Sequence, residues 1–172
     1  AQRVMVSITS FLEQKLKLVV NRQKSAVDRP WKRTFLGYGM TFHQTPKLKP
    51  GQKAVERVKS KLKELIRKGR GRNLKKVIEE AMPILRGWSN YFNLSEVKKP
   101  FEELDSWFRR KLRCIIWRQW KHPKTRFKKL MQRGLPEEQA AKSAYNGRGP
   151  WWNAGASHMN KAFGLSYFRK LG

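Results

Sequence analysis

The chain has 172 residues, and its 40 Lys and Arg against 12 Asp and Glu give a formal net charge of +28 at pH 7. A charge of this size repels itself in isolation, so we expect an acidic counterpart: nucleic acid, an anionic membrane or an acidic protein. The sequence contains no run of 18 apolar residues that could span a membrane, and its opening residues lack the apolar core of a secretion signal. The single Cys114 excludes an intramolecular disulfide. These features predict a protein of the bacterial cytoplasm or of an organelle that is neither secreted nor membrane-bound.

The basic residues are distributed along the whole chain and do not form a tail. Seven Trp and nine Phe are spread through the same sequence. A disordered basic arm concentrates its charge and is poor in aromatic residues. We therefore expect the basic surface to belong to a folded body.

Residues 1–50 predict a helix followed by two short strands. Apolar residues recur at helical spacing near the start of the chain, at Val4, Ile8, Phe11, Leu12 and Leu16. Residues 18–20 and 35–42 have the composition of strands. Proline residues then interrupt the pattern, and we place a domain boundary between residues 50 and 51.

Residues 51–122 predict a domain of three helices. The first is expected over 52–68, ended by Gly69 and Gly71. The second begins at residue 74, and Pro83 should kink or restart it. The third begins near Pro100, a favourable residue for a first turn, and Pro123 closes it.

Residues 123–172 predict a basic and aromatic C-terminal region. Two short helices are expected over 125–132 and 136–144, followed by a loop-rich tail from Asn146. Trp151 and Trp152 are adjacent and point in different directions, so we expect one to pack and the other to be partly open. The fold class that follows is mostly α: a helical bundle preceded by a small α+β part.

The third helix has two opposed faces when it is projected at about 100° per residue. An apolar stripe expected in the core consists of Phe101, Leu104, Phe108, Leu112 and Ile115. The opposite face carries Arg110, Arg113, Trp117, Trp120 and Lys121. These two Trp either stack on nucleic-acid bases or pack against the following helix or the tail, and the pattern leaves both interpretations open.

The same helix opens a strongly basic run, with eleven Lys or Arg and no acid between Arg109 and Arg133. Each neutralised phosphate releases condensed counterions, and exposed Trp beside Arg can stack on unpaired bases, which favours irregular RNA over smooth duplex DNA. A solvated basic face is the other interpretation. The RNA-binding candidates in this run are Arg109, Arg110, Arg113, Trp117, Trp120, Lys121, Lys124, Arg126, Lys128 and Lys129.

No set of catalytic or metal-binding residues is recognisable. Phosphoryl or nucleotidyl transfer needs a carboxylate cluster that holds two metal ions, but Asp28 and Asp105 are the only aspartates. The three histidines and Cys114 lack the spacing of a zinc site. The sequence therefore predicts no catalytic residue, no metal site and no cofactor in this chain.

Several segments, taken in chain order, resemble group II intron-encoded reverse transcriptases, which are also maturases. Residues 18–25 (LVVNRQKS) and 35–42 (FLGYGMTF) are similar to the last part of the polymerase palm. Residues 85–92 (LRGWSNYF) resemble the hallmark of the maturase-specific region, called the thumb or domain X. Residues 112–120 and 149–158 (GPWWNAGASH) resemble the end of intron proteins without a carboxy-terminal endonuclease.

The resemblance implies a palm remnant over residues 1–50 and a thumb or domain X over 51–122. In the hallmark, Arg86 would contact RNA. The hallmark residues expected in the bundle core are Trp88, Tyr91 and Phe92. The hairpin that supports a primer end would correspond to Phe35, Leu36, Gly37 and Tyr38. The family's paired metal-binding aspartates would lie before Ala1, so Mg²⁺ is expected only for the parent polymerase or for the intron RNA.

The resulting hypothesis is a maturase fragment that binds group II intron RNA and assists its folding and splicing, while the RNA itself performs the transesterifications. In one alternative, the chain is part of an active RNA-directed DNA polymerase, split or truncated, with an N-terminal reverse-transcriptase segment as its partner. In the other, it is a general basic module for structured RNA.

Overall fold

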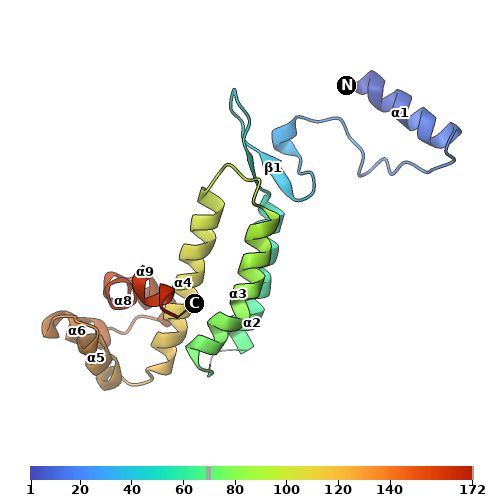
Figure 1. Cartoon of the computed structure of the whole chain (residues 1–172). Coiled ribbons are helices and arrows are strands. Elements are labelled where there is room, and N and C mark those ends of the chain that lie inside the picture. Colours follow the sequence, from blue (N-terminus) through green and yellow to red (C-terminus); the bar gives the residue numbers. More distant parts are fainter. Residues whose placement is uncertain (69–70, 172) are drawn as a thin grey trace.

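The computed structural model describes residues 1–68 and 71–171, and helices dominate this part of the chain. Three long helices form the centre of the molecule: α2 (Gln52–Lys68), α3 (Leu74–Tyr91) and α4 (Lys99–Gln119). They lie alongside one another, and each contacts the other two (Figure 1). The strands found among the described residues form one two-stranded sheet, so the predicted mostly-α fold with a small α+β part is confirmed.

The core lies where α2, α3 and α4 face one another. Four residues of the stripe predicted on the third helix are buried, and Phe101 is half-buried. The other two helices contribute Val58, Leu62, Ile66, Val77, Ile78 and Ala81. Helical spacing alone placed these apolar side chains on one side of each helix, which is why the three helices can bury them together.

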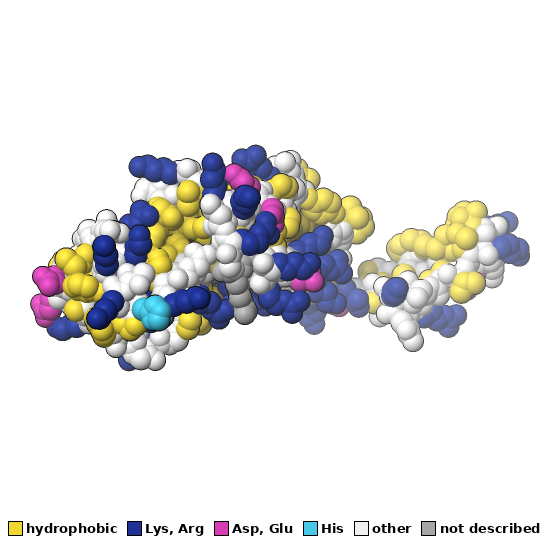
Figure 2. Space-filling view, turned by 90° about the horizontal axis from the view of Figure 1, so that it is seen from below, with side chains coloured by type: hydrophobic (Ala, Val, Ile, Leu, Met, Phe, Trp, Pro, Cys, Tyr) yellow, Lys and Arg dark blue, Asp and Glu magenta, His cyan; other side chains and the backbone are white. Residues whose placement is uncertain are grey.

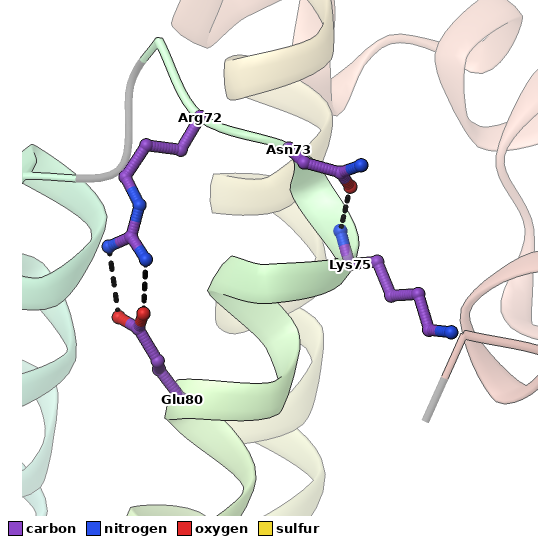
Figure 3. A network of polar contacts seen from close by, with 4 residues as sticks. All are labelled: Arg72, Asn73, Lys75 and Glu80. Atoms are coloured by element: carbon purple, nitrogen blue, oxygen red, sulfur yellow. Dashed lines mark hydrogen bonds and ion pairs between the residues drawn. The ribbon is translucent and has the colours of Figure 1, made fainter.

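Polar contacts fix the start of α3. The side chain of Asn73 accepts a hydrogen bond of 2.9 Å from the backbone N–H of Lys75, one of the donors that a helix start leaves without a partner (Figure 3). Arg72 pairs through two guanidinium nitrogens with both carboxylate oxygens of Glu80. Further along, Pro83 lies inside α3, which continues to Tyr91, so the predicted restart of the helix is wrong. The predicted stop of the preceding helix at Gly69 lies outside the described residues.

The C-terminal region is more helical than the sequence indicated. The two expected helices are α5 (Pro123–Gln132) and α6 (Glu137–Ala144). The expected loop-rich tail instead forms α7 (Pro150–Gly155), α8 (Ser157–Ala162) and α9 (Leu165–Arg169). These helices are one to two turns long, too short for a periodic pattern to reveal, and α7 is held by extensive packing against α4.

The N-terminal region contains α1 (Gln2–Gln14), a 3-10 turn (Pro30–Lys32), β1 (Tyr38–Met40) and β2 (Leu48–Pro50). The strands pair antiparallel, with Gly39 opposite Lys49. The strand predicted over residues 18–20 does not form, and the one predicted over 35–42 is reduced to β1. In Figure 1, α1 stands apart from the helical body, and none of its residues is buried. No helix of the described residues is long and apolar enough to cross a membrane.

Candidate nucleic-acid interface

Two of the five residues on the face of α4 that we predicted to bind RNA are buried, and two more are half-buried. The side chain of Trp117 is fully buried, and Arg113 is 7% exposed. The prediction that both reach RNA from an open face is therefore wrong in its geometry. The reason is that α5, α7 and α8 cover this side of α4, whereas a helical projection treats α4 as if only one side had neighbours.

Arg113 is held by backbone carbonyls near the ends of two short helices. Its Nε donates to Ala154 O at 2.9 Å, and one terminal nitrogen donates to Phe163 O at 3.2 Å. Carbonyls at helix ends have no partner within the helix and carry partial negative charge, so they suit a buried cation. Burial lowers the pKa of Arg113 to about 10, and Arg109 and Arg110 add to this effect, so the group stays charged at pH 7.

The two Trp of this face pack as the second interpretation proposed. The ring centroid of Trp117 lies 5.5 Å from that of His158 in α8, and the Arg126 guanidinium lies 4.7 Å from the Trp117 centroid. Trp120 packs against Phe163 with ring centroids 5.6 Å apart. Arg126 also donates from Nε to Trp120 O at 2.8 Å, and burial lowers its pKa. These contacts give Arg126 a role in packing rather than one at a free surface.

The remaining predicted basic residues differ in what they contact. Arg109 forms an ion pair with Asp105 on the preceding turn. Arg110 donates to Trp151 O at 3.0 Å and lies 4.1 Å from the Trp151 ring centroid. The exposed members of the predicted set are Arg86, Lys121, Lys124, Lys128 and Lys129. Figure 2 shows Lys and Arg side chains spread over the helical body, with Asp and Glu side chains sparse by comparison.

A tryptophan–cation surface, which we define as Lys59, Trp107, Arg110, Lys111 and Trp151, connects α2, α4 and α7. The Lys111 ammonium lies 4.4 Å from the Trp151 ring centroid and 5.7 Å from that of Trp107. The Lys59 ammonium, from α2, lies 5.9 Å from the Trp107 ring centroid. Trp151 is 40% exposed, so part of its ring is open to a ligand. Cations beside open indole rings are the arrangement that binds phosphates and unpaired bases together.

The loop before α7 is fixed by a buried asparagine. Asn153 is fully buried, and its amide donates to Arg148 O at 2.8 Å and to Gly149 O at 3.2 Å. It also pairs with the side chain of Asn146 in both directions. Trp151 and Trp152 are thereby presented on a short helix at 40% and 45% exposure, so the prediction that one packs while the other is open is wrong. Arg148 lies 4.2 Å from the Trp152 ring centroid.

A basic hollow lies beside this surface, between α2 and α4. It has a volume of about 260 Å³ and apolar walls of Ile66, Cys114 and Ile115. Its cations are Lys63, Arg67, Lys111 and Arg118. Burial lowers the pKa of Lys111, and the charges of Lys63, Arg118 and Arg110 act in the same direction. These cations repel one another, and an anion bound among them relieves the repulsion. A phosphate is such an anion.

The residues of the LRGWSNYF hallmark divide between core and surface. Phe92 is buried, and Trp88 is half-buried against Phe92 and Phe101, with ring centroids 5.0 and 5.1 Å apart. Tyr91 is 56% exposed, so its predicted place in the core is wrong. The reason is a polar contact: the Tyr91 hydroxyl donates to Leu36 O at 2.9 Å, which holds the ring at the surface.

The predicted primer-support segment forms a tight hairpin turn. Phe35 and Tyr38 exchange backbone hydrogen bonds of 2.8 and 2.9 Å. Leu36 and Gly37 between them have φ of 50° and 80°, the two positive values that a type I′ turn requires. Phe35 and Leu36 are exposed at the tip, while the Tyr38 hydroxyl donates to Tyr91 O at 2.6 Å. This turn is therefore attached to the end of α3.

Within residues 1–68 and 71–171, no group of three or more His, Cys, Asp or Glu side chains could hold a metal ion. Two carboxylates of α4 form local ion pairs: Asp105 pairs with Arg109, and Glu103 pairs with Lys99.

Sequence reasoning missed most of the surface that the structure assembles. The residues it did not select are Lys59, Lys63, Arg67, Trp107, Lys111, Arg118, Arg148, Trp151 and Trp152. One signal was available: Lys59, Lys63 and Arg67 recur every fourth residue and so share one side of α2. The approach of α7 to α4 had no signal of this kind, because residues 110 and 151 are joined only by tertiary packing.

Residues 55–134 match the family model described as group II intron, maturase-specific domain. The match begins within α2, contains the LRGWSNYF hallmark, and ends just after α5. The resemblance found in the sequence is thus confirmed for this segment, while the palm-like residues 1–50 lie outside it. None of the curated proteins matches the chain.

Proposed function

We propose that this chain binds group II intron RNA and helps the RNA reach its splicing-active structure. The maturase-specific segment, residues 55–134, connects the chain with group II intron splicing. The observation that carries RNA binding is the tryptophan–cation surface together with the basic hollow, which share Lys111. The chain's net charge of +28 supports a polyanionic partner.

The proposed contact uses two kinds of interaction. The cations of the basic hollow neutralise backbone phosphates, and the release of condensed counterions favours the complex. Trp151, held in place by the buried Asn153 network, offers an open ring to an unpaired base. Lys121, Lys124, Lys128 and Lys129 are exposed and add further positive charge to the segment that follows α4. Such a surface holds RNA segments close together against phosphate repulsion, while the transesterifications remain chemistry of the RNA.

The test measures affinity for a group II intron RNA and for an unrelated structured RNA of equal length, at several salt concentrations. Trp151→Ala should weaken intron binding by about 1–3 kcal/mol with little change in salt dependence. Arg118→Gln should instead reduce the slope of log affinity against log salt by about 0.7–0.9. A splicing assay at low Mg²⁺ should show slower splicing for both variants.

Trp31→Ala is the matched control. Trp31 is also an exposed indole with a nearby cation, since Arg29 lies 5.6 Å from its centroid, but it lies outside the proposed surface. It should bind intron RNA like the wild type. Equal affinity of the wild-type chain for both RNAs would contradict intron binding and favour a general RNA-binding module.

A further inference from the structure

Gly87 lies within α3, four residues before the helix ends at Tyr91, where glycine lowers helix stability relative to alanine. Nothing in the described part of the chain, residues 1–68 and 71–171, explains this choice. A Cβ built at Gly87 would meet no atom of the described structure within 4 Å, so alanine would fit without strain. Gly155, by contrast, leaves the space that the Arg110 guanidinium fills, because a Cβ there would lie 2.6 Å from that group. Packing against the described residues therefore does not require glycine at position 87, and the α3 backbone there is open to a molecule outside the chain.

Gly87 lines a groove between α2 and α3. The groove has a volume of about 1050 Å³ and extends to the turn that contains Leu36 and Gly37. Its apolar lining includes Ala54, Val58, Ile84, Trp88 and Phe92. Two of the lining residues are small, Ser60 on α2 and Gly87 on α3. Because Gly87 has no side chain, a ligand in the groove can approach the backbone of α3 closely.

The α2 wall of this groove carries a row of cations. Lys53, Arg57 and Lys61 all line it at four-residue spacing, which places successive charges about 6 Å apart along the helix axis. None of the three forms an ion pair with another described residue. The one acid in the lining, Glu56, accepts a hydrogen bond from Gln52 Nε2 at 3.0 Å.

We propose that the α2–α3 groove is a second RNA-binding site, in which Gly87 lets the sugar–phosphate backbone of a strand lie against α3. The proposal rests on the proposed function, because it assumes that the partner is RNA. α2 then presents cations on both sides of its apolar stripe: Lys59, Lys63 and Arg67 toward α4, and Lys53, Arg57 and Lys61 toward α3. The repeating cations match a repeating anion, and the apolar lining suits ribose carbons, whereas an acidic protein segment would need no access to a glycine backbone.

The experiment compares Gly87→Ala and Gly87→Leu with the wild type in RNA affinity and thermal stability. Gly87→Ala should raise Tm by about 2–4 °C, because alanine favours the helix and meets no atom. Both variants should weaken intron RNA binding, and Gly87→Leu should do so by about tenfold or more. A gain in stability combined with a loss of affinity is the signature that a merely structural glycine would not give.

Two controls make the result specific. Ser106→Leu places the same side chain on an exposed position of α4 that lines no groove described above, and its RNA affinity should stay at the wild-type value. Changing Lys53, Arg57 and Lys61 to Gln should reduce the salt slope by about 2 to 3 units. Replacing the exposed Lys98, Lys161 and Lys170 removes the same charge outside the groove and should reduce the slope less.

If Gly87→Leu folds and binds intron RNA like the wild type, the groove is not an RNA site, even where the wild-type chain binds well. Failure of the wild-type chain to bind intron RNA would instead overturn the proposed function itself. If Gly87→Leu loses its cooperative thermal transition, Gly87→Ala still decides the question, because its side chain meets no atom of the structure.

Discussion

Helices α1 and α4 are both amphipathic in sequence, yet they meet different fates in the structure. The apolar stripe of α4 is buried, and its opposite, basic face is buried as well, at Arg113 and Trp117. None of the apolar residues of α1 is buried, and Ile8 is 51% and Phe11 54% exposed. The comparison teaches that a stripe shows which side of a helix can be buried, whereas the neighbours in space decide whether it is buried and whether the other side is buried too.

The largest effect that would test this contrast is expected from Trp117→Ala. Trp117 is fully buried among α4, α5 and α8, so the substitution leaves a large cavity and should cost about 3–5 kcal/mol of unfolding free energy. Chemical denaturation followed by circular dichroism measures this loss. Trp151→Ala, at an indole that is 40% exposed, should cost much less, and equal losses for both would show that the burial contrast is wrong.

A smaller loss is expected for Arg113→Gln. The glutamine is too short to reach both Ala154 O and Phe163 O, and losing charge-assisted hydrogen bonds at a buried site should cost about 2–3 kcal/mol. The salt slope of RNA binding should not change in the folded variant. Arg118→Gln should show the reverse behaviour, with stability within about 0.5 kcal/mol and a reduced slope. A reduced slope of log affinity against log salt for Arg113→Gln would show that Arg113 contacts RNA after all.

Acidification should lower the free energy of unfolding, because His158 lies buried between α4 and the helices that cover it. This side chain is 4% exposed, its Nε2 has no hydrogen-bond partner in the described structure, and burial lowers its pKa below 6.5. Between the folded and unfolded pKa values the unfolded chain therefore binds more protons. Stability is fully present above about pH 6.5 and falls as pH drops below it, by at most about 1.4 kcal/mol per pH unit for one proton.

Urea denaturation at a series of pH values measures this dependence in the wild type and in His158→Gln. The variant should lose the part of the slope that lies just below pH 6.5. His122→Gln, at an exposed position that precedes α5, should keep it. An unchanged slope in His158→Gln would assign the pH dependence to other groups.

The smallest effect is expected at α1. Phe11→Ala should change the unfolding free energy by less than about 0.5 kcal/mol, because no residue of α1 is buried. The measurement is repeated at several protein concentrations. A loss that grows with protein concentration would show that the apolar stripe of α1 is covered by a second copy of the chain. Both stripes would then be buried, that of α4 within one chain and that of α1 between two chains.

The sequence alone determined the parts of this protein that depend on local periodicity. The spacing of Leu104, Phe108, Leu112 and Ile115 identified the core face of α4. Val58, Leu62 and Ile66, which are buried in α2, recur at the same four-residue spacing. Composition predicted an acidic partner, and LRGWSNYF pointed to the maturase-specific domain that matches residues 55–134. These signals survive without a structure because each depends on residues only a few positions apart.

Tertiary structure alone decided which cations are free and which aromatic rings are open. Arg113 and Arg118 lie on one basic helix, yet the first is buried under carbonyls of the C-terminal helices and the second faces a hollow. Lys111 lies against the Trp151 ring, and the Tyr91 hydroxyl donates to Leu36 O at the surface. Both contacts connect segments more than 35 residues apart in the sequence. Side chains from distant segments share space only when the backbone has packed, so the spacing of residues within one helix carries no information about them.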